Sequence, residues 1–443
     1  MSLWSLLSLA SLLLVFLPEA SKGYPSPVFR RACLLLPLLL LAACQEPPPR
    51  TAGPLRQEAY VWQRSWTPAV QESVAQATDF AGLVVLAAEV DFRGPQPRVT
   101  RVPLEGKTLR ALGRPVGAAV RATAFSGTFA ESPEIVRLLQ GTVRGVAAEA
   151  RAQGISLTEI QLDYDCPESK LNDYRDVLPA LREAASPVPL TLTALPSWMR
   201  SRRAFRQLVA GVDRYVLQLH SLVLPEKAGE VAALIEPRSA RGWVEAAARF
   251  GRPFRAALPT YGYEVAYDAR GKLLGVLAEG PLLTWSPDVT VRAVRSDPKA
   301  MAELIRSWVR DRPAALTGVV WYRLPVEGDR LNWSWPTLRA VAAGRAPRGD
   351  LRAVIREPEP KLAEVDLVNA GEAEAPWPAT VRLRWQGPAP SAADGLAVYK
   401  VVRAERGGLD LARSAAGLLR PGERRAIAWV RFAARTEVQV ELR

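Results

Sequence analysis

The chain has 443 residues, a formal net charge of +13 and three cysteines. Its basic residues are spread along the chain without a Lys/Arg block or an RNA-binding motif, so the composition argues against nucleic acid as a partner. Cys166 is the only cysteine in the predicted folded body, which excludes an intramolecular disulfide there and leaves core burial as the source of stability.

The first element is predicted to be a secretory leader. Arg30 and Arg31 precede an apolar run at 34–41, which leads into Leu-Ala-Ala-Cys at 41–44. A basic segment, a short apolar segment and small residues before a cleavage point are typical of a signal peptide. Because cysteine follows directly, the run resembles a bacterial lipobox, which implies cleavage before Cys44 and lipidation of that residue.

An uncleaved membrane anchor is the alternative, but the run at 34–43 is too short to span about 30 Å of hydrocarbon. A second apolar run lies within residues 1–19, and we interpret it as sequence upstream of the true start, near Val28. The predicted location is the bacterial cell envelope, with the protein anchored to a membrane through Cys44 and facing the periplasm or exterior.

These features divide the chain into a leader at 1–43, a lipid-anchored, proline-rich tether at 44–58, and two folded domains. In the first, at 59–345, short apolar runs alternate with helical patterns, which predicts an α/β fold of the (β/α)8 TIM-barrel type, typically about 250 residues long. The predicted strands are Tyr60–Trp66, Gly82–Val90, Val116–Phe125, Thr158–Asp165, Val188–Leu195, Arg214–Leu219, Phe254–Tyr261 and Leu316–Leu324.

The clearest helical pattern between these strands is Pro133–Ala152, with Ser132 as N-cap and Gly154 as the stop. An open doubly wound sheet is the alternative fold. It is disfavoured because no glycine-rich phosphate loop follows the first strand. After residue 345 the composition changes to period-two segments separated by turns, which predicts a small all-β, sandwich-like domain at 346–443.

The fourth predicted strand carries the strongest chemical signal, in the run IQLDYDCP. Side chains alternate along a strand, so Gln161, Asp163 and Asp165 share the face toward the barrel axis, at the end where barrel enzymes place their active sites. Two carboxylates in a poorly hydrated cavity cannot both ionise freely, so one pKa is expected to rise and prepare a proton donor. In the alternative, Asp163 pairs with an arginine and Asp165 caps the turn.

Other strand ends supply candidate partners. We predict Asp163, Asp165, Glu264 and Glu89 as catalytic residues, with Asp165 or Glu264 as general acid and Asp163 tuning Asp165. Polar and aromatic residues at or near the strand ends are predicted to bind substrate, because aromatic faces suit sugar rings and Arg323 could orient a carboxylate. They are Gln161, His220, Trp198, Tyr261, Tyr322, Arg323 and Trp333.

The run IQLDYDCP, with YVLQLHSL, ALPTYGYE and VVWYRLPVEGD downstream, resembles a bacterial lipoprotein family catalogued as domain of unknown function 3142. That resemblance implies a barrel similar to those of glycoside hydrolases. Asp163 and Asp165 match the centre of the chitinase-type signature D-x-x-D-x-D-x-E. However, Ile160 replaces its first aspartate, and Pro167 replaces its glutamate, with Glu168 one residue late.

The sequence therefore predicts an exported lipoprotein that hydrolyses or binds a glycan. The alternative is a non-catalytic carbohydrate-binding or scaffolding lipoprotein of the envelope, which the Pro167 departure favours. No cofactor is predicted. No metal site is predicted either, because the chain has a single histidine and Cys166 has no nearby partner in sequence.

Overall fold

The structure is a computed structural model that describes residues 47–220, 233–278 and 285–443. The predicted leader and Cys44 lie outside the described residues. Residues Pro48–Arg443 form one compact unit. Within the described residues, no helix is long and apolar enough to cross a membrane.

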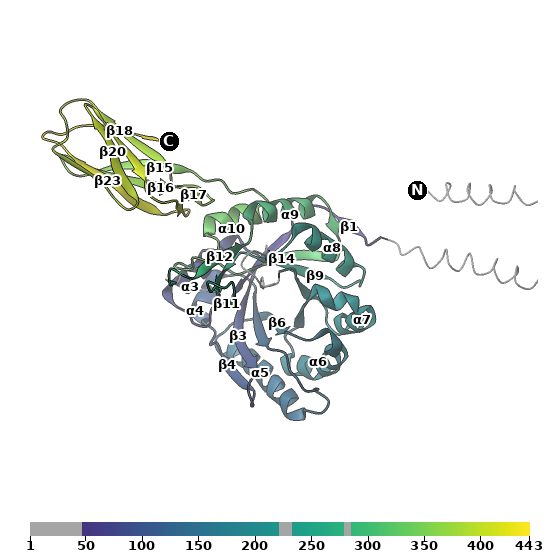
Figure 1. Ribbon diagram of the computed structural model, residues 1–443. Helices are drawn as coiled ribbons and strands as arrows, with labels where there is room; N and C mark the ends of the chain where they lie inside the picture. The colour runs from purple at the N-terminus through teal and green to yellow at the C-terminus, as the bar shows by residue number, and fades with distance from the viewer. Residues whose placement is uncertain (1–46, 221–232, 279–284) are drawn as a thin grey trace, which may run out of the picture. The chain divides into compact units, whose positions relative to one another are not determined.

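A closed parallel barrel forms the first domain, and its helices surround the sheet (Figure 1). Around the barrel the strand order is β2-β14-β9-β8-β7-β6-β5-β3, and pairing of β2 with β3 closes the circle. This closure confirms the TIM-type barrel and excludes the open sheet. The described barrel strands are β2 (Arg56–Val61), β3 (Leu83–Asp91), β5 (Val116–Ala122), β6 (Leu157–Tyr164), β7 (Leu190–Ala194), β8 (Tyr215–Gln218), β9 (Phe254–Pro259) and β14 (Leu316–Tyr322).

Each predicted strand overlaps one of these, because a strand that is buried on both faces reads as a nearly continuous apolar run. The described α-helices are α3 (Pro68–Ala75), α4 (Gly106–Leu112), α5 (Pro133–Ala152), α6 (Leu171–Ala185), α7 (Arg202–Ala210), α8 (Pro237–Ala248), α9 (Pro298–Arg310) and α10 (Trp335–Ala342). Helix α5 has the predicted bounds, although the side chain of Ser132 makes no capping hydrogen bond.

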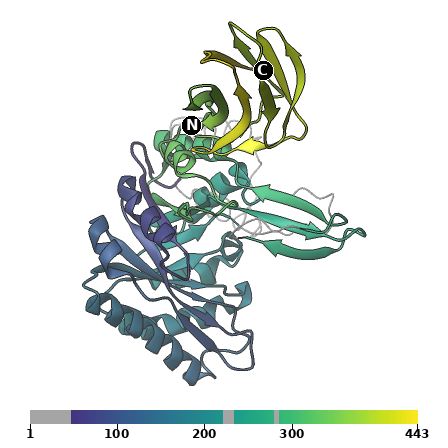
Figure 2. The same cartoon turned by 90° about the vertical axis from the view of Figure 1, so that its left-hand side faces the viewer.

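Two additions to the barrel were not predicted. Strand β4 (Arg98–Arg101) pairs antiparallel with the upper part of β3. Between β9 and α9, the strands β10 (Gly262–Tyr267), β11 (Leu273–Leu277) and β12 (Thr290–Arg295) form a separate antiparallel sheet with β10 in the middle. Figure 2 shows this sheet in teal-green, projecting from the barrel.

The floor of the barrel is polar and fully buried. Arg255 on β9 contacts Glu58 on β2, and its Nη2 lies 2.6 Å from Glu159 Oε2 on β6. Thr191 donates to the same Glu159 oxygen at 2.9 Å. Above this floor, apolar side chains from the strands fill the axis, including Leu86, Val216 and Val320. The barrel is therefore a packed core, open to chemistry only at its ends.

The described part of the predicted tether, residues 47–58, is attached to the barrel. Strand β1 (Arg50–Thr51) pairs with β13 (Arg312–Pro313), and β2 begins at Arg56. Arg50 also forms ion pairs with Asp311 at 2.6 Å and Glu245 at 2.9 Å. The folded body thus begins before Ala59, because these contacts hold the proline-rich segment against the barrel.

The second domain is an all-β structure of two four-stranded antiparallel sheets, β15-β16-β23-β19 and β20-β21-β18-β24. Their inner faces share one apolar core that includes Val365, Leu383 and Ile427. The described strands are β15 (Leu351–Glu359), β16 (Leu362–Asn369), β17 (Ala375–Pro376), β18 (Thr380–Trp385), β19 (Ala392–Gly395), β20 (Tyr399–Glu405), β21 (Gly408–Arg413), β22 (Leu418–Leu419), β23 (Arg424–Arg431) and β24 (Val438–Leu442).

Candidate active site at the barrel mouth

Three charged residues form a row across adjacent strands near the C-terminal mouth. Glu89 on β3 is in register with Arg121 on β5, which is in register with Asp163 on β6. In-register residues on neighbouring strands point to the same side and lie about 4.8 Å apart. The barrel therefore brings two carboxyl groups together, with a guanidinium group between them, from three separate strands.

Asp163 is a partly buried carboxyl in this row. Thr193 on β7 donates a hydrogen bond to its Oδ1 at 2.7 Å. Burial raises the pKa of Asp163, and the negative charge of Asp165 raises it further, while Thr193 and Arg121 act in the opposite direction. The net effect favours the protonated carboxyl, which is the form that a proton donor needs.

Asp165 follows β6 directly and is more open to solvent. Its side chain is 50% exposed, and its Oδ2 lies 3.6 Å from Arg121 Nη2. A hydrogen bond from its backbone N–H to Ala122 O, at 3.1 Å, fixes the turn that carries it. Of the two, Asp163 is the more buried carboxyl, which makes it the stronger candidate for a proton donor.

Glu89 is held by two arginines. Arg64 Nε and Nη2 lie 2.5 and 2.9 Å from its two carboxylate oxygens, and Arg121 Nη1 lies 3.9 Å away. Such a two-point contact orients a carboxylate firmly. Glu89 thus lies near the end of its strand, in register with Arg121, and its two ion pairs hold Arg121 and Arg64 near the acid pair.

An aromatic group borders the mouth near the ends of β8, β9 and β14. The ring of His220 stacks on Tyr322 with centroids 5.3 Å apart, and His220 Nδ1 lies 3.2 Å from the hydroxyl of Tyr261. The Tyr261 hydroxyl also contacts that of Tyr263 at 2.7 Å. Burial lowers the pKa of His220 to about 4, so its imidazole is neutral at physiological pH.

Gln161 lies one step below Asp163 on β6. It is fully buried and donates a hydrogen bond to the hydroxyl of Tyr60 at 2.5 Å. The Tyr60 ring packs edge-on against Tyr322, with centroids 5.7 Å apart. Gln161 therefore supports the aromatic wall from beneath, and its predicted contact with substrate is wrong at this level of burial.

Arg323 follows Tyr322 and is buried with 2% of its side chain exposed. It forms an ion pair with Asp329 in the loop after β14, and its guanidinium lies 5.9 Å from the ring centroid of Tyr261. The carboxylate that Arg323 orients is thus Asp329, and not one of the predicted catalytic aspartates.

The two tryptophans predicted to stack on sugar lie elsewhere. Trp198 is 1% exposed and donates from Nε1 to Cys166 O at 3.1 Å, so it belongs to the core between strands and helices. Trp333 is partly exposed but lines a cavity between the barrel and the β domain. The prediction is wrong for Trp198, because its turn folds the indole inward.

Two glutamates are placed away from the row. Glu264 lies on β10 of the projecting sheet, where it pairs in register with Leu277 and Ala293. Glu168 is bound by Arg200 at 2.8 Å and by Ser201 at 3.0 Å, and the hydrogen bond from Arg200 lowers its pKa. Glu168 therefore does not replace the glutamate that Pro167 displaces.

The residues that sequence reasoning missed are Arg121, Arg64 and Thr193. Arg121 could have been found, since it alternates with Gly117 and Ala119 on the inward face of its strand. Among the described residues, no group of three or more His, Cys, Asp or Glu side chains could hold a metal ion. Burial raises the pKa of the Cys166 thiol to about 12, so this cysteine is not activated.

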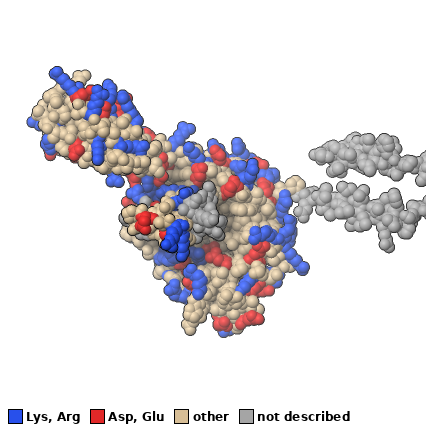
Figure 3. All heavy atoms as spheres, viewed as in Figure 1, with Lys and Arg blue, Asp and Glu red and all other residues tan. Residues whose placement is uncertain are grey.

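The surface carries both signs of charge. On the face seen in Figure 3, Lys and Arg are interspersed with Asp and Glu over the barrel. No sign dominates this view, which agrees with the spread of charge along the sequence.

The comparisons with known proteins identify families without an assigned activity. Residues 112–327 match the model of DUF3142, a domain of unknown function, and residues 353–433 match DUF8456, another domain of unknown function. No curated protein matches the chain.

Solved structures with a similar course include the spore cortex-lytic enzyme SleL of Bacillus megaterium, with 13% identity and a TM-score of 0.46 over 67% of this chain and 75% of that one. SleL of Bacillus cereus has 11% identity and a TM-score of 0.47, over 66% and 75%. A chitinase of Chromobacterium violaceum has 15% identity and a TM-score of 0.43, over 66% and 100%. The barrel assignment rests on the strand order of the chain itself.

Proposed function

We propose that the protein is a glycoside hydrolase with Asp163 as proton donor. Residues 112–327 match DUF3142, a family whose name assigns no activity, so the proposal rests on the chemistry of the site. The observation that carries this proposal is the placement of Asp163, a partly buried carboxyl in register with Arg121 and two residues from Asp165, at the C-terminal mouth of a TIM barrel. Burial, which raises the pKa of Asp163, is consistent with this role. Barrel enzymes carry out their chemistry at this end.

Hydrolysis of a glycosidic bond needs an acid and a carboxylate. In the proposed mechanism, Asp163 protonates the leaving oxygen as the glycosidic bond breaks, and Asp165 stabilises the positive charge that develops on the sugar ring. Water then forms the new bond to the anomeric carbon and gives its proton to the Asp163 carboxylate, which restores the acid. Arg121 and Arg64 hold Asp165 and Glu89 around this point. Tyr322, partly exposed and supported by the ring of His220, offers an aromatic face to the sugar.

The test is a hydrolysis screen of the purified full chain against glycans of the bacterial envelope. Asp163→Asn should lower kcat by about 100-fold or more, the usual contribution of a general acid. Glu168→Gln is the matched control, since Glu168 lies in the loop after the same strand but is bound by Arg200. Full activity in Asp163→Asn would remove Asp163 from the mechanism.

Glycan recognition without hydrolysis is the second candidate. It is supported by Pro167 at the position of the chitinase-type glutamate and by the pairing of Glu168 with Arg200. Under this proposal the wild-type chain binds a glycan that it never cleaves, and Asp163→Asn binds it with unchanged affinity. Detection of any product that disappears in Asp163→Asn would reject it.

We further propose that the protein is exported and anchored in the bacterial envelope through Cys44. The support is the basic and apolar run that ends in Leu-Ala-Ala-Cys. Mass spectrometry of the chain expressed in a bacterium should find a lipidated N-terminal cysteine at position 44, and Cys44→Ser should release the protein from the membrane fraction. A mature protein that retains residues 1–43 would contradict this proposal.

A further inference from the structure

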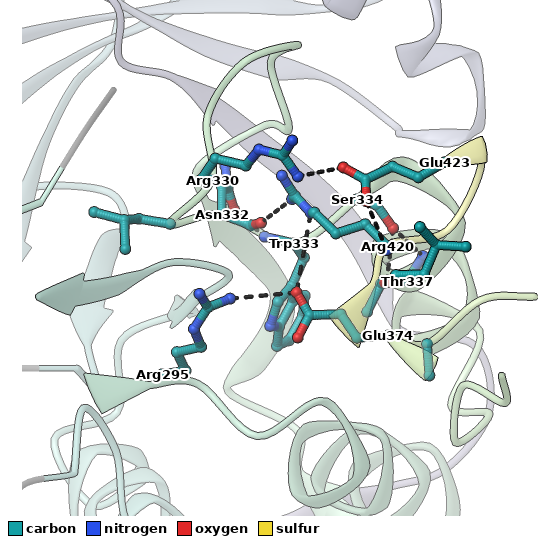
Figure 4. Close-up of polar contacts among 12 residues, drawn as sticks. Arg295, Arg330, Asn332, Trp333, Ser334, Thr337, Glu374, Arg420 and Glu423 are labelled. Atoms are coloured by element: carbon teal, nitrogen blue, oxygen red, sulfur yellow. Dashed lines mark hydrogen bonds and ion pairs between the residues drawn. The ribbon is translucent and has the colours of Figure 1, made fainter. Parts of the chain in front are cut away.

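A cavity of about 560 Å³ lies between the barrel and the β domain, within the usual range of about 300–1,000 Å³ for ligand sites. Its wall comes from the end of β12, the start of α9, the loop after β14, and the segments that flank β17 and β22. Figure 4 shows the polar side chains that meet there. None of the residues in the charged row of the mouth lines it.

Trp333 supplies the apolar wall of this cavity. Its Nε1 donates to Ser296 O at 3.1 Å, and its ring packs against Trp321 with centroids 5.9 Å apart. These contacts fix the indole in place while part of it remains exposed. A fixed, partly exposed indole is suited to receive the apolar face of a sugar ring.

Three cationic side chains line the same cavity, namely Arg295, Lys299 and Arg420. The carboxylates that oppose them are Asp297 and Glu374. Asp297 accepts from the backbone N–H of Lys299 at 2.9 Å, as the N-cap of α9. The cations thus exceed the acids in the lining.

Glu374 lies between two of the arginines and accepts only a long hydrogen bond, from Arg295 (Figure 4). Its Oε1 is 3.4 Å from Arg295 Nη1 and 4.0 Å from Arg420 Nε. By comparison, the paired oxygens of Asp410 in the β domain lie 2.6 Å from Arg382. The positive charge around Glu374 is therefore only loosely matched.

Arg420 is the more buried of these arginines, with 17% of its side chain exposed. Its terminal nitrogens donate to Asp329 O at 3.1 Å and to Asn332 O at 2.6 Å, and these carbonyl groups carry no net charge. Burial lowers the pKa of Arg420 despite the nearby Glu374. A second anion in the cavity would stabilise this guanidinium.

We propose that the cavity binds an acidic saccharide, with the sugar ring against Trp333 and its anionic group between Arg295, Lys299 and Arg420. Glu374 accepts hydrogen bonds from the hydroxyls of the same sugar. This combination accounts for the indole, the excess of cations and the loosely held carboxylate together. The cavity shares Tyr261 with the aromatic group of the mouth but none of the charged row, and binding there does not require hydrolysis.

Calorimetric titration of the full chain tests the proposal, with glucuronic acid as the probe and glucose as the same ring without the charge. Glucuronic acid should bind at millimolar concentration or below and at least about tenfold more tightly than glucose. Arg295→Gln should weaken glucuronic acid binding about tenfold, as expected for a lost charge-assisted hydrogen bond. Arg292→Gln, an exposed arginine on the same strand outside the cavity, should not.

Asp163→Asn separates this site from the mouth, because it should leave glucuronic acid binding unchanged. Thermal unfolding of each variant confirms that it is folded. Equal affinity for the two sugars, equal effects of Arg295→Gln and Arg292→Gln, or absence of binding would each overturn the proposal. Loss of binding only in Asp163→Asn would place the sugar at the mouth and overturn it as well.

Discussion

The floor and the mouth of the barrel both contain arginines and carboxylates. At the floor these charges are closely paired, whereas at the mouth the pairing is incomplete. At the floor, the side chains of Arg255, Glu58 and Glu159 are 6%, 9% and 2% exposed, and Arg255 contacts both carboxylates. Arg56 adds a second cation, 2.7 Å from Glu58. Every charge there has a close partner, so the group is closed to a ligand.

At the mouth, Arg121 faces three carboxylates and is close to none of them. It lies 3.6 Å from Asp165 and 3.9 Å from Glu89, and its side chain is 37% exposed. Asp163 next to it is driven toward its neutral form. Ion pairing by itself therefore does not mark a site, whereas incomplete pairing with access to solvent leaves a proton free to move.

The largest effect is expected at the floor. Arg255→Met should lower the free energy of unfolding by about 3–5 kcal/mol, because it leaves two carboxylates buried without their shared cation. Arg121→Met at the mouth should cost only about 1 kcal/mol, the value of a partly exposed pair. Urea unfolding of both variants measures these losses in the free energy of unfolding. Equal losses would show that the ion pairs of the floor and of the mouth contribute equally to stability.

The second-largest effect is expected in the pH dependence of hydrolysis at the mouth. Activity that requires protonated Asp163 falls about tenfold per pH unit above its raised pKa. Arg121 opposes that rise, so Arg121→Gln should move the falling limb of the kcat profile to higher pH. A shift to lower pH would mean that the titrating group is not Asp163.

Stability should also depend on Asp163. Its folded pKa lies above its unfolded value of about 3.9, so its contribution is complete below that value and is lost as the pH rises through the folded pKa. Asp163→Asn, which cannot ionise, should therefore gain stability relative to the wild type as the pH rises from 3 to 7. Urea unfolding across this pH range measures it, and a constant difference would contradict a raised pKa.

The smallest effect concerns His220, the only histidine in the chain. Burial lowers its pKa to about 4, so its imidazole should stay neutral between pH 5 and 8. The nuclear magnetic resonance signals of its ring, measured on a chain without a histidine tag, should shift only below pH 5. Titration near pH 6.5 would show that water reaches the stacked pair of His220 and Tyr322.

The sequence was sufficient for the barrel because each of its strands is a buried apolar run between helical patterns. The projecting sheet was not predicted, since β11 and β12 are largely exposed and lack that pattern. For the site, the position of Asp163 and Asp165 followed from alternation along β6. Their roles did not, because burial depends on neighbouring strands that bring Thr193 and Arg121 to the carboxyls.

Loops were the least predictable part of the site. Trp198 and Trp333 both lie beside polar residues, but Trp198 is enclosed by a 3-10 turn, whereas Trp333 is held at a cavity by its contacts with Ser296 and Trp321. Glu168 is bound by Arg200, a residue of the next loop, and so lies outside the charged row. Such contacts join distant segments, so no local pattern reveals them.

The pairing of β1 with β13 has a consequence for the reach of an anchored protein. Arg50 follows Cys44 by six residues, which extend to no more than about 20 Å. It is fixed beside Pro313, just before β14, at the end of the barrel opposite to the mouth. A lipid at Cys44 would thus hold the base of the barrel close to the bilayer and direct the mouth outward, toward polymers that lie above the membrane surface.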